Sequence, residues 1–162
     1  MAIENLKDLF VHTLQDIYYA EKKIVKALPK MVKAADSAQL RKAFEKHLAE
    51  TEGQVKRLED VFAAIDEKPK AVKCPAIDGI LDEADELVGE IKDKDTRDAA
   101  MIAAAQAVEH YEITRYGTLA SWAGMLGLDE AVTLLEKTLE EEKATDLALT
   151  KLAESKLNKE AA

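Results

Sequence analysis

The chain has 162 residues, of which 34% are charged, and 32 Asp and Glu against 23 Lys and Arg give a formal net charge of −9. This acidic balance argues against nucleic acid and membranes as partners, because both anionic surfaces attract a basic field. No segment reads as a bilayer span, and the first ten residues lack the basic start and apolar run of a secretory signal. The single cysteine, Cys74, excludes an internal disulfide. We therefore expect a cytoplasmic protein with one domain over residues 1–162.

The first half of the chain predicts two long helices. Ala, Leu, Glu and Lys dominate, and β-branched residues never alternate with polar ones over a useful length. The first helix is expected over residues 5–35 with Asn5 as its N-cap, and Pro29 should kink it or loosen one turn. A tight connection then leads to Ser37, which can cap a second helix reaching residue 65.

The second half predicts one short and two long helices. Residues 66–76 contain two prolines and are expected to form a loop, and apolar residues at spacings of three and four then predict a short amphipathic helix over 77–91. A long helix is expected from a cap at Thr96 to residue 124, and a last one over residues 129–157. Short turns make each pair of long helices an antiparallel hairpin.

The connection of about thirty residues between the hairpins decides at which end of the bundle the third long helix can start. A helix of about thirty residues is roughly 45 Å long, and a connection that contains its own helix can travel this distance. The third long helix can then start at the end opposite to that expected for a simple up-down bundle, which is the ferritin-like arrangement. The predicted fold class is therefore all-α, a ferritin-like four-helix bundle with a short crossover helix. A simple up-down bundle remains the alternative.

The apolar face of each predicted long helix is interrupted near its centre by carboxylates. These are Glu21, Glu50, Glu109 with Glu112, and Glu142. Each lies within about two residues of its helix centre, or roughly 3 Å along the axis, so the hairpins should bring all five to one level of the core.

Burying so much negative charge without compensation would cost several kcal/mol per group. Protonation, nearby cationic side chains or bound cations could relieve it. No position on the apolar faces of the central turns is Lys or Arg, although Arg115 is close to them. Two divalent hard cations would neutralise four carboxylates and give their oxygens partners. The pattern therefore predicts a dinuclear, carboxylate-rich metal site.

The carboxylate on each of four helices, with EHYE at 109–112, resembles the ferritin-like di-iron carboxylate superfamily. Longer segments resemble, more narrowly, the bacterial YciE/YciF-type family, a ferritin-like group associated with stress responses; they are LQDIYYAEKKIVKALPKM (14–31), FEKHLAETEGQVKRLEDVF (44–62), VEHYEITRYGTLASWA (108–123) and LLEKTLEEEKATDLALTKLA (134–153). The resemblance covers nearly the whole chain. It implies a four-helix bundle with a crossover helix, a homodimer and a dinuclear iron-type site.

One departure from the superfamily concerns its Glu-x-x-His motifs. Three residues after Glu50 and Glu142 stand Gly53 and Thr145, where the superfamily usually has histidine. Gln54, Asp146 and His47 are possible substitutes, and an oxygen-rich site would suit iron or manganese while weakening oxygen activation. The predicted ligands of two divalent ions, iron or else manganese, are Glu21, Glu50, Glu109, Glu112, Glu142, Asp146 and His47.

Two of these residues have alternative roles. Glu112 could pair with Arg115 at i+3 instead of bridging metals, and His47 could be a satisfied core histidine. Tyr18 and Tyr116 each lie one turn from a predicted ligand and could donate hydrogen bonds to carboxylates.

Three functional hypotheses follow. The first is a dinuclear stress-response metalloprotein with weak oxidase or peroxide-consuming activity, whose small oxidant would be oxygen or peroxide. The second is a non-catalytic scaffold in which any metal only stabilises the bundle. The third is phosphotransfer at His47, which the acidic neighbours Glu45 and Glu50 disfavour.

Overall fold

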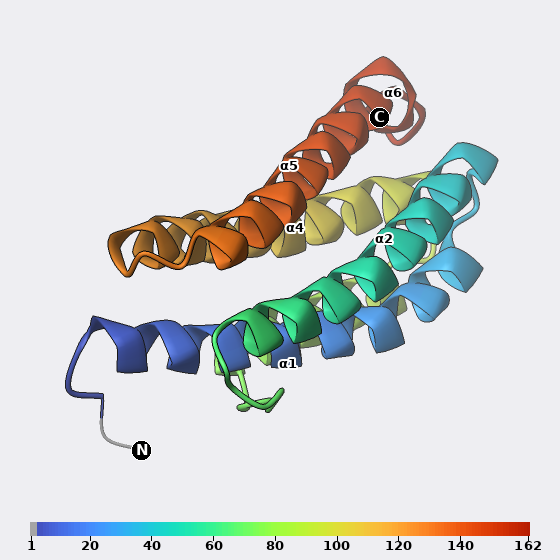
Figure 1. Ribbon diagram of the computed structural model, residues 1–162. Coiled ribbons are helices and arrows are strands. Elements are labelled where there is room, and N and C mark those ends of the chain that lie inside the picture. Colours follow the sequence, from blue (N-terminus) through green and yellow to red (C-terminus); the bar gives the residue numbers. More distant parts are fainter. Residues whose placement is uncertain (1–2) are drawn as a thin grey trace.

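The computed structural model describes residues 3–162 and has the all-α architecture that the composition and helical periodicity predict (Figure 1). Within this range the elements are α1 (Leu6–Ala34), α2 (Ala38–Ala64), α3 (Pro75–Glu90), α4 (Lys94–Met125), α5 (Asp129–Leu152), a π-helical turn (Ala153–Leu157) and α6 (Asn158–Glu160). No helix in this range has the length and apolar character needed to cross a bilayer.

Helices α1 and α2 form the first hairpin, and capping side chains set where they begin. The Asn5 side-chain oxygen accepts a hydrogen bond from the amide of Asp8 at 2.9 Å, and Ser37 caps α2 in the same way. Both predicted N-caps are confirmed. The helix α1 continues past Pro29, whose side chain is exposed, so the proline does not end it.

The segment between α2 and α4 returns along α1. It begins with a hydrogen bond from the amide of Val72 to the carbonyl of Gln15 at 3.1 Å. Helix α3 then runs parallel to α1 toward its C-terminal end. Three side-chain contacts mark this course: Tyr19 with Asp78, Lys30 with Asp85, and Asp36 with Lys94.

Because of this return, α4 starts beside the α1–α2 turn and runs antiparallel to α1. The hydroxyl of Tyr111, halfway along α4, donates to Asp16 in the first half of α1 at 2.7 Å. Helix α5 is likewise antiparallel to α2, as the Thr145–Glu50 contact at 3.4 Å indicates. The crossover topology is confirmed, and the simple up-down alternative is wrong.

The second hairpin, α4 and α5, differs from its prediction at both ends. The N-cap of α4 is Asp93 and not Thr96: the Asp93 carboxylate accepts from the amide of Thr96 at 2.8 Å, which places Thr96 inside the first turn. Gly127, with a φ of 70°, makes the turn between the helices, a conformation that glycine adopts without steric cost. The predicted last helix gives way at Leu152 to the π-helical turn.

The core between the hairpins is apolar toward its ends and polar at mid-height. Large side chains such as Phe10, Phe44 and Phe62 are fully buried. At mid-height the buried residues include four carboxylates and one imidazole: Glu21, Glu109, Glu112, Glu142 and His47. Charged side chains are seldom buried unless they are paired, so this level of the bundle is the candidate site.

A further buried carboxylate joins the two hairpins. Asp98, 1% exposed in the first turns of α4, accepts the backbone amides of Asp36 and Ser37 at 3.0 and 2.6 Å. These amides belong to the α1–α2 turn, so Asp98 fixes the start of α4 to the first hairpin.

We expect Asp98→Ala to lower the free energy of unfolding by about 2–4 kcal/mol, because it leaves two amides without their charged acceptor. Urea denaturation followed by circular dichroism measures the change. The control is Asp95→Ala, which removes an exposed carboxylate from the same turn and should cost about 0.3–1 kcal/mol. Equal losses in the two variants would contradict the role given to Asp98.

Candidate metal centre

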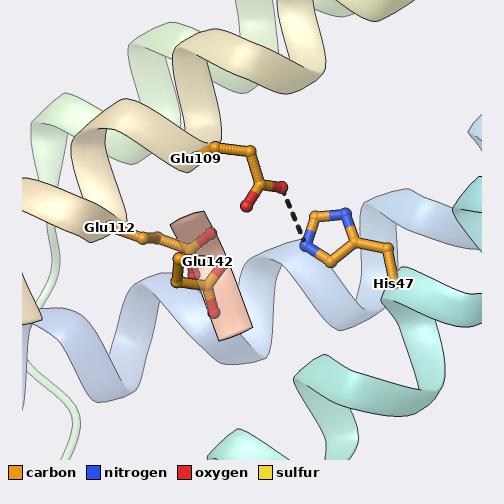
Figure 2. Close-up of side chains that lie close together, drawn as sticks. All are labelled: His47, Glu109, Glu112 and Glu142. Carbon is orange, nitrogen blue, oxygen red and sulfur yellow. Dashed lines mark ion pairs between the residues drawn. The ribbon is translucent and has the colours of Figure 1, made fainter. Parts of the chain in front are cut away.

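Four side chains from three helices converge at mid-height of the bundle (Figure 2). His47 comes from α2, Glu109 and Glu112 from α4, and Glu142 from α5. Each offers one ligand atom, and these atoms all lie within 4.8 Å of one another. We call these four residues the central cluster.

The helix geometry explains why these residues meet. Glu109 and Glu112 are three residues apart, so they project from the same face of α4. That face also carries the buried residues Ala105 and Tyr116, and it therefore points into the core. The antiparallel partner α5 brings Glu142 to the same level, and α2 supplies His47 from across the bundle.

The carboxylates of the central cluster have no hydrogen-bond partner among residues 3–162. Both oxygens of Glu109, Glu112 and Glu142 are buried without a hydrogen bond. Among residues 3–162, no lysine or arginine forms an ion pair with them. The Nε2 atom of His47 lies 3.1 Å from a Glu109 oxygen, but without hydrogen-bond geometry. These are the donor atoms that a cation requires.

Glu21 on α1 is the next carboxylate at this level. One of its oxygens accepts a hydrogen bond from the hydroxyl of Tyr116, and its other oxygen is buried without a partner. Tyr116 thus donates to a carboxylate, as expected, but to Glu21 on α1 and not to Glu112 one turn away on its own helix. Its pKa is raised by burial and by the charge of Glu142, so Glu21 lies within the electrostatic reach of the central cluster.

The pKa values of these groups follow from burial and mutual repulsion. Burial is the largest cause for all four carboxylates, and it raises the pKa of Glu21 to about 8 and that of Glu142 to about 7. The pKa values of Glu109 and Glu112 are also raised by burial, and further by neighbouring carboxylates. Burial and the Lys46 charge lower the pKa of His47 to about 4. At neutral pH this imidazole is therefore neutral, the form that binds metals.

The donor set fits a divalent ion by size as well as by chemistry. Oxygen and nitrogen ligands lie about 2.0–2.5 Å from such ions, so two ligand atoms of one ion are at most about 4–5 Å apart. The separations within the central cluster stay within 4.8 Å. The cluster can therefore hold a metal ion.

Glu50 and Asp146, two further predicted ligands, lie beside the central cluster and outside it. The Glu50 side chain is 27% exposed and pairs with Lys46. Asp146 contacts His110 at 3.2 Å and accepts from Gln106 at 3.0 Å on the outer side of α4 and α5. Both still act on the site, since Glu50 raises the pKa of Glu142 and Asp146 raises that of Glu109.

The predicted alternative for Glu112, a pair with Arg115, is wrong. Arg115 lies 3.8 Å from Asp16 and over the ring of Tyr111, with 5.1 Å to the ring centroid. Tyr18 likewise donates to Glu59 at 2.8 Å and not to a carboxylate of the site.

A cationic group near the site was not foreseen from the sequence. Arg57 on α2 binds both oxygens of Glu141 on α5, at 2.8 and 2.9 Å, and also donates to Thr138. Gln54, a possible ligand from the sequence, donates to the same carboxylate at 3.3 Å and has a buried amide oxygen without a partner. Gln54 and Arg57 are three residues apart and therefore lie on the same face of α2. This spacing is the feature of the sequence from which a basic group beside the site could have been predicted.

The raised pKa values predict how the stability of the metal-free protein depends on pH. A carboxyl group with a raised pKa in the folded state favours folding when protonated, so its contribution is complete below the unfolded pKa, about 4.5. The contribution is lost as pH rises through about 7 for Glu142 and about 8 for Glu21.

We therefore expect the free energy of unfolding of the wild type to fall between pH 5 and pH 8. In Glu142→Gln this fall should be smaller by about 2–3 kcal/mol, because the variant has no carboxyl group to ionise at this position. Urea denaturation with chelator at both pH values measures it. Glu136→Gln, an exposed change on the same helix, is the control. The same pH dependence in all three proteins would count against buried protonated carboxylates.

The comparisons with known proteins agree with this architecture. The model of a family described as a domain of unknown function, DUF892, matches residues 5–162. Protein YciF of Escherichia coli K12 is 47% identical over 162 residues, which cover 99% of this chain and 98% of that protein.

Solved structures extend the match to three dimensions. The crystal structure of the E. coli stress protein YciF has a TM-score of 0.93 at 47% identity and covers 97% of this chain and 99% of its own. YcfI of Rhodopseudomonas palustris has a TM-score of 0.90 at 53% identity and covers 91% and 94%. A Xanthomonas campestris protein shares the fold alone, with a TM-score of 0.72 at 20% identity and coverage of 93% and 92%. YciF is thus a relative over the full chain, and the family match over residues 5–162 shows that this chain belongs to the DUF892 family.

Proposed function

We propose that this chain is a dinuclear metal-binding protein that takes part in a stress response. The observation that carries the proposal is the set of six buried carboxylate oxygens on Glu109, Glu112 and Glu142 that have no hydrogen-bond partner. Hydrogen bonds or a cation normally satisfy such groups, and no lysine or arginine of residues 3–162 forms an ion pair with them.

The charge at the site supports two divalent ions. Glu21 and the three carboxylates of the central cluster carry four negative charges when ionised, and two divalent ions neutralise them. The first ion would use the converging atoms of His47, Glu109, Glu112 and Glu142. The second would draw on Glu21 and on the remaining carboxylate oxygens, since each carboxylate can bridge two ions.

The ligand chemistry supports iron or manganese. Carboxylate oxygens are hard ligands, and one neutral imidazole adds affinity for first-row transition metals. Bound iron would supply redox chemistry toward a small oxidant, and the chain's own groups hold the ligands in place. Tyr116 orients Glu21 by its hydrogen bond, while Arg57 and Gln54 fix the neighbouring Glu141.

A stress role is proposed from the relationship with YciF, which is described as a stress protein. The weak oxidase or peroxide-consuming activity, the cytoplasmic location and the homodimer stay predictions from the sequence.

A second candidate function is that of a non-catalytic scaffold. YcfI is described as a candidate structural protein and is 53% identical to this chain. The missing histidines at Gly53 and Thr145 also favour a site that holds metal without vigorous redox turnover.

The first test is anaerobic titration of the metal-free protein with Fe(II) or Mn(II). We expect about two ions per chain, and a stabilisation of roughly 3 kcal/mol for each bound ion when free metal is a hundred times its Kd. Glu112→Gln should bind fewer ions, because it removes a charge and a ligand in a nearly unchanged shape. Glu136→Gln serves as the control, and normal metal binding by Glu112→Gln would argue against the proposed site.

Glu50 and Asp146 need a separate test. We expect Glu50→Gln and Asp146→Asn to keep both ions but to lose about tenfold to hundredfold in affinity, as groups that act on ligands from outside do. Isothermal titration with Mn(II) measures this. A loss of one whole ion in either variant would instead make that residue a direct ligand.

Exposure of the Fe(II)-loaded protein to oxygen or peroxide separates the two candidate functions. Growth of ferric absorbance at a rate above that of free Fe(II) supports the catalytic role, and stable binding without oxidation supports the scaffold.

A further inference from the structure

An apolar cavity of about 50 Å³ lies beside the central cluster, between α1, α2, α3 and α4. Ten of its twelve lining residues are apolar, and the two others are His47 and Asp85. Its inner part, the buried lining, contains His47 and six apolar residues. Among these, Ile24 is three residues after Glu21 and Ala105 is four residues before Glu109. His47 is thus shared by the cavity and the cluster.

The position of His47 gives the cavity a polar contact. The ring is 3% exposed, with Nε2 toward Glu109, while its Nδ1 atom points away from Glu109 and has no hydrogen-bond partner (Figure 2). Among the buried lining residues, His47 is the one polar side chain in an otherwise apolar wall.

The mouth of the cavity lies between α1, α3 and α4. Its half-buried members are Ala27 and Met31 on α1, Leu81 on α3 and Ala104 on α4. Asp85 is exposed there and pairs with Lys30 across the helices at 3.3 Å. Solvent therefore meets charged groups at the rim and apolar groups inside.

We propose that this cavity binds an uncharged diatomic molecule of the size of dioxygen and holds it beside His47. A buried water needs two to four polar partners, and the inner part offers one, so water and hydrogen peroxide are poorly accommodated. Apolar cavities stay dry and take up apolar guests, and one of about 150 Å³ holds benzene or xenon. At about 50 Å³, the present cavity is suited to a smaller guest.

The binding part of this inference stands without metal, whereas delivery of oxygen to the cluster rests on the proposed function. Xenon is an apolar probe of suitable size, and metal-free crystals pressurised with it report binding directly. We expect one xenon site beside His47 in wild type. Ala105→Leu should fill the inner part and abolish it, and Ala103→Leu, an exposed change on the same helix, should preserve it.

Ala27→Leu at the mouth is the second filling variant, in case Ala105→Leu fails to fold. The absence of xenon from the wild-type cavity, or its retention in the filled variants, would overturn the proposal. In Fe(II)-loaded protein, filling should slow oxidation by oxygen several-fold while the metal stoichiometry stays unchanged, and an unchanged rate would overturn delivery. Xenon binding in a protein that takes up no metal would leave the cavity assignment intact and refute the proposed function instead.

Discussion

Four carboxylates without a basic partner among residues 3–162 are buried at mid-height of the bundle, where ionisation of each one opposes folding. Glu21, Glu109, Glu112 and Glu142 are fully buried, and their pKa values are raised mainly by burial. Such groups oppose folding when ionised, so the bundle holds them together only with protons or cations. The apolar layers above and below, built around residues such as Phe44 and Phe62, stabilise the bundle around this level.

The order and direction of the helices bring the buried carboxylates and His47 together at mid-height of the bundle. The crossover through α3 makes α4 antiparallel to α1 and α5 antiparallel to α2, which sets Glu109 and Glu112 opposite His47 and beside Glu142. Asp98 anchors the start of α4 to the α1–α2 turn, and the Arg57–Glu141 pair ties α2 to α5 next to the cluster. Polar contacts outside the central cluster thus hold the helices that present its ligands.

His47 joins two environments of opposite character. One side of its ring faces the carboxylates, and the ring also lines an apolar cavity that opens between α1, α3 and α4. A charged site that adjoins a dry cavity can separate the roles of metal binding and of small-molecule access. In a scaffold the same cavity would be only a packing defect, so the function of the cavity and that of the cluster are best tested independently.

The amino-acid sequence was sufficient to predict the helices, the two N-caps at Asn5 and Ser37, and the mid-helix carboxylates, because capping and periodicity are local. The central positions of Glu21, Glu109, Glu112 and Glu142 also predicted their burial, since short turns place helix centres side by side. The pairing of Glu50 with Lys46, of Asp146 with His110 and of Arg115 with Asp16 became apparent from the packing of the helices. Long side chains near the edge of an apolar face can rotate inward or outward. The choice between core and rim depends on partners supplied by other helices, which spacing along one helix does not reveal.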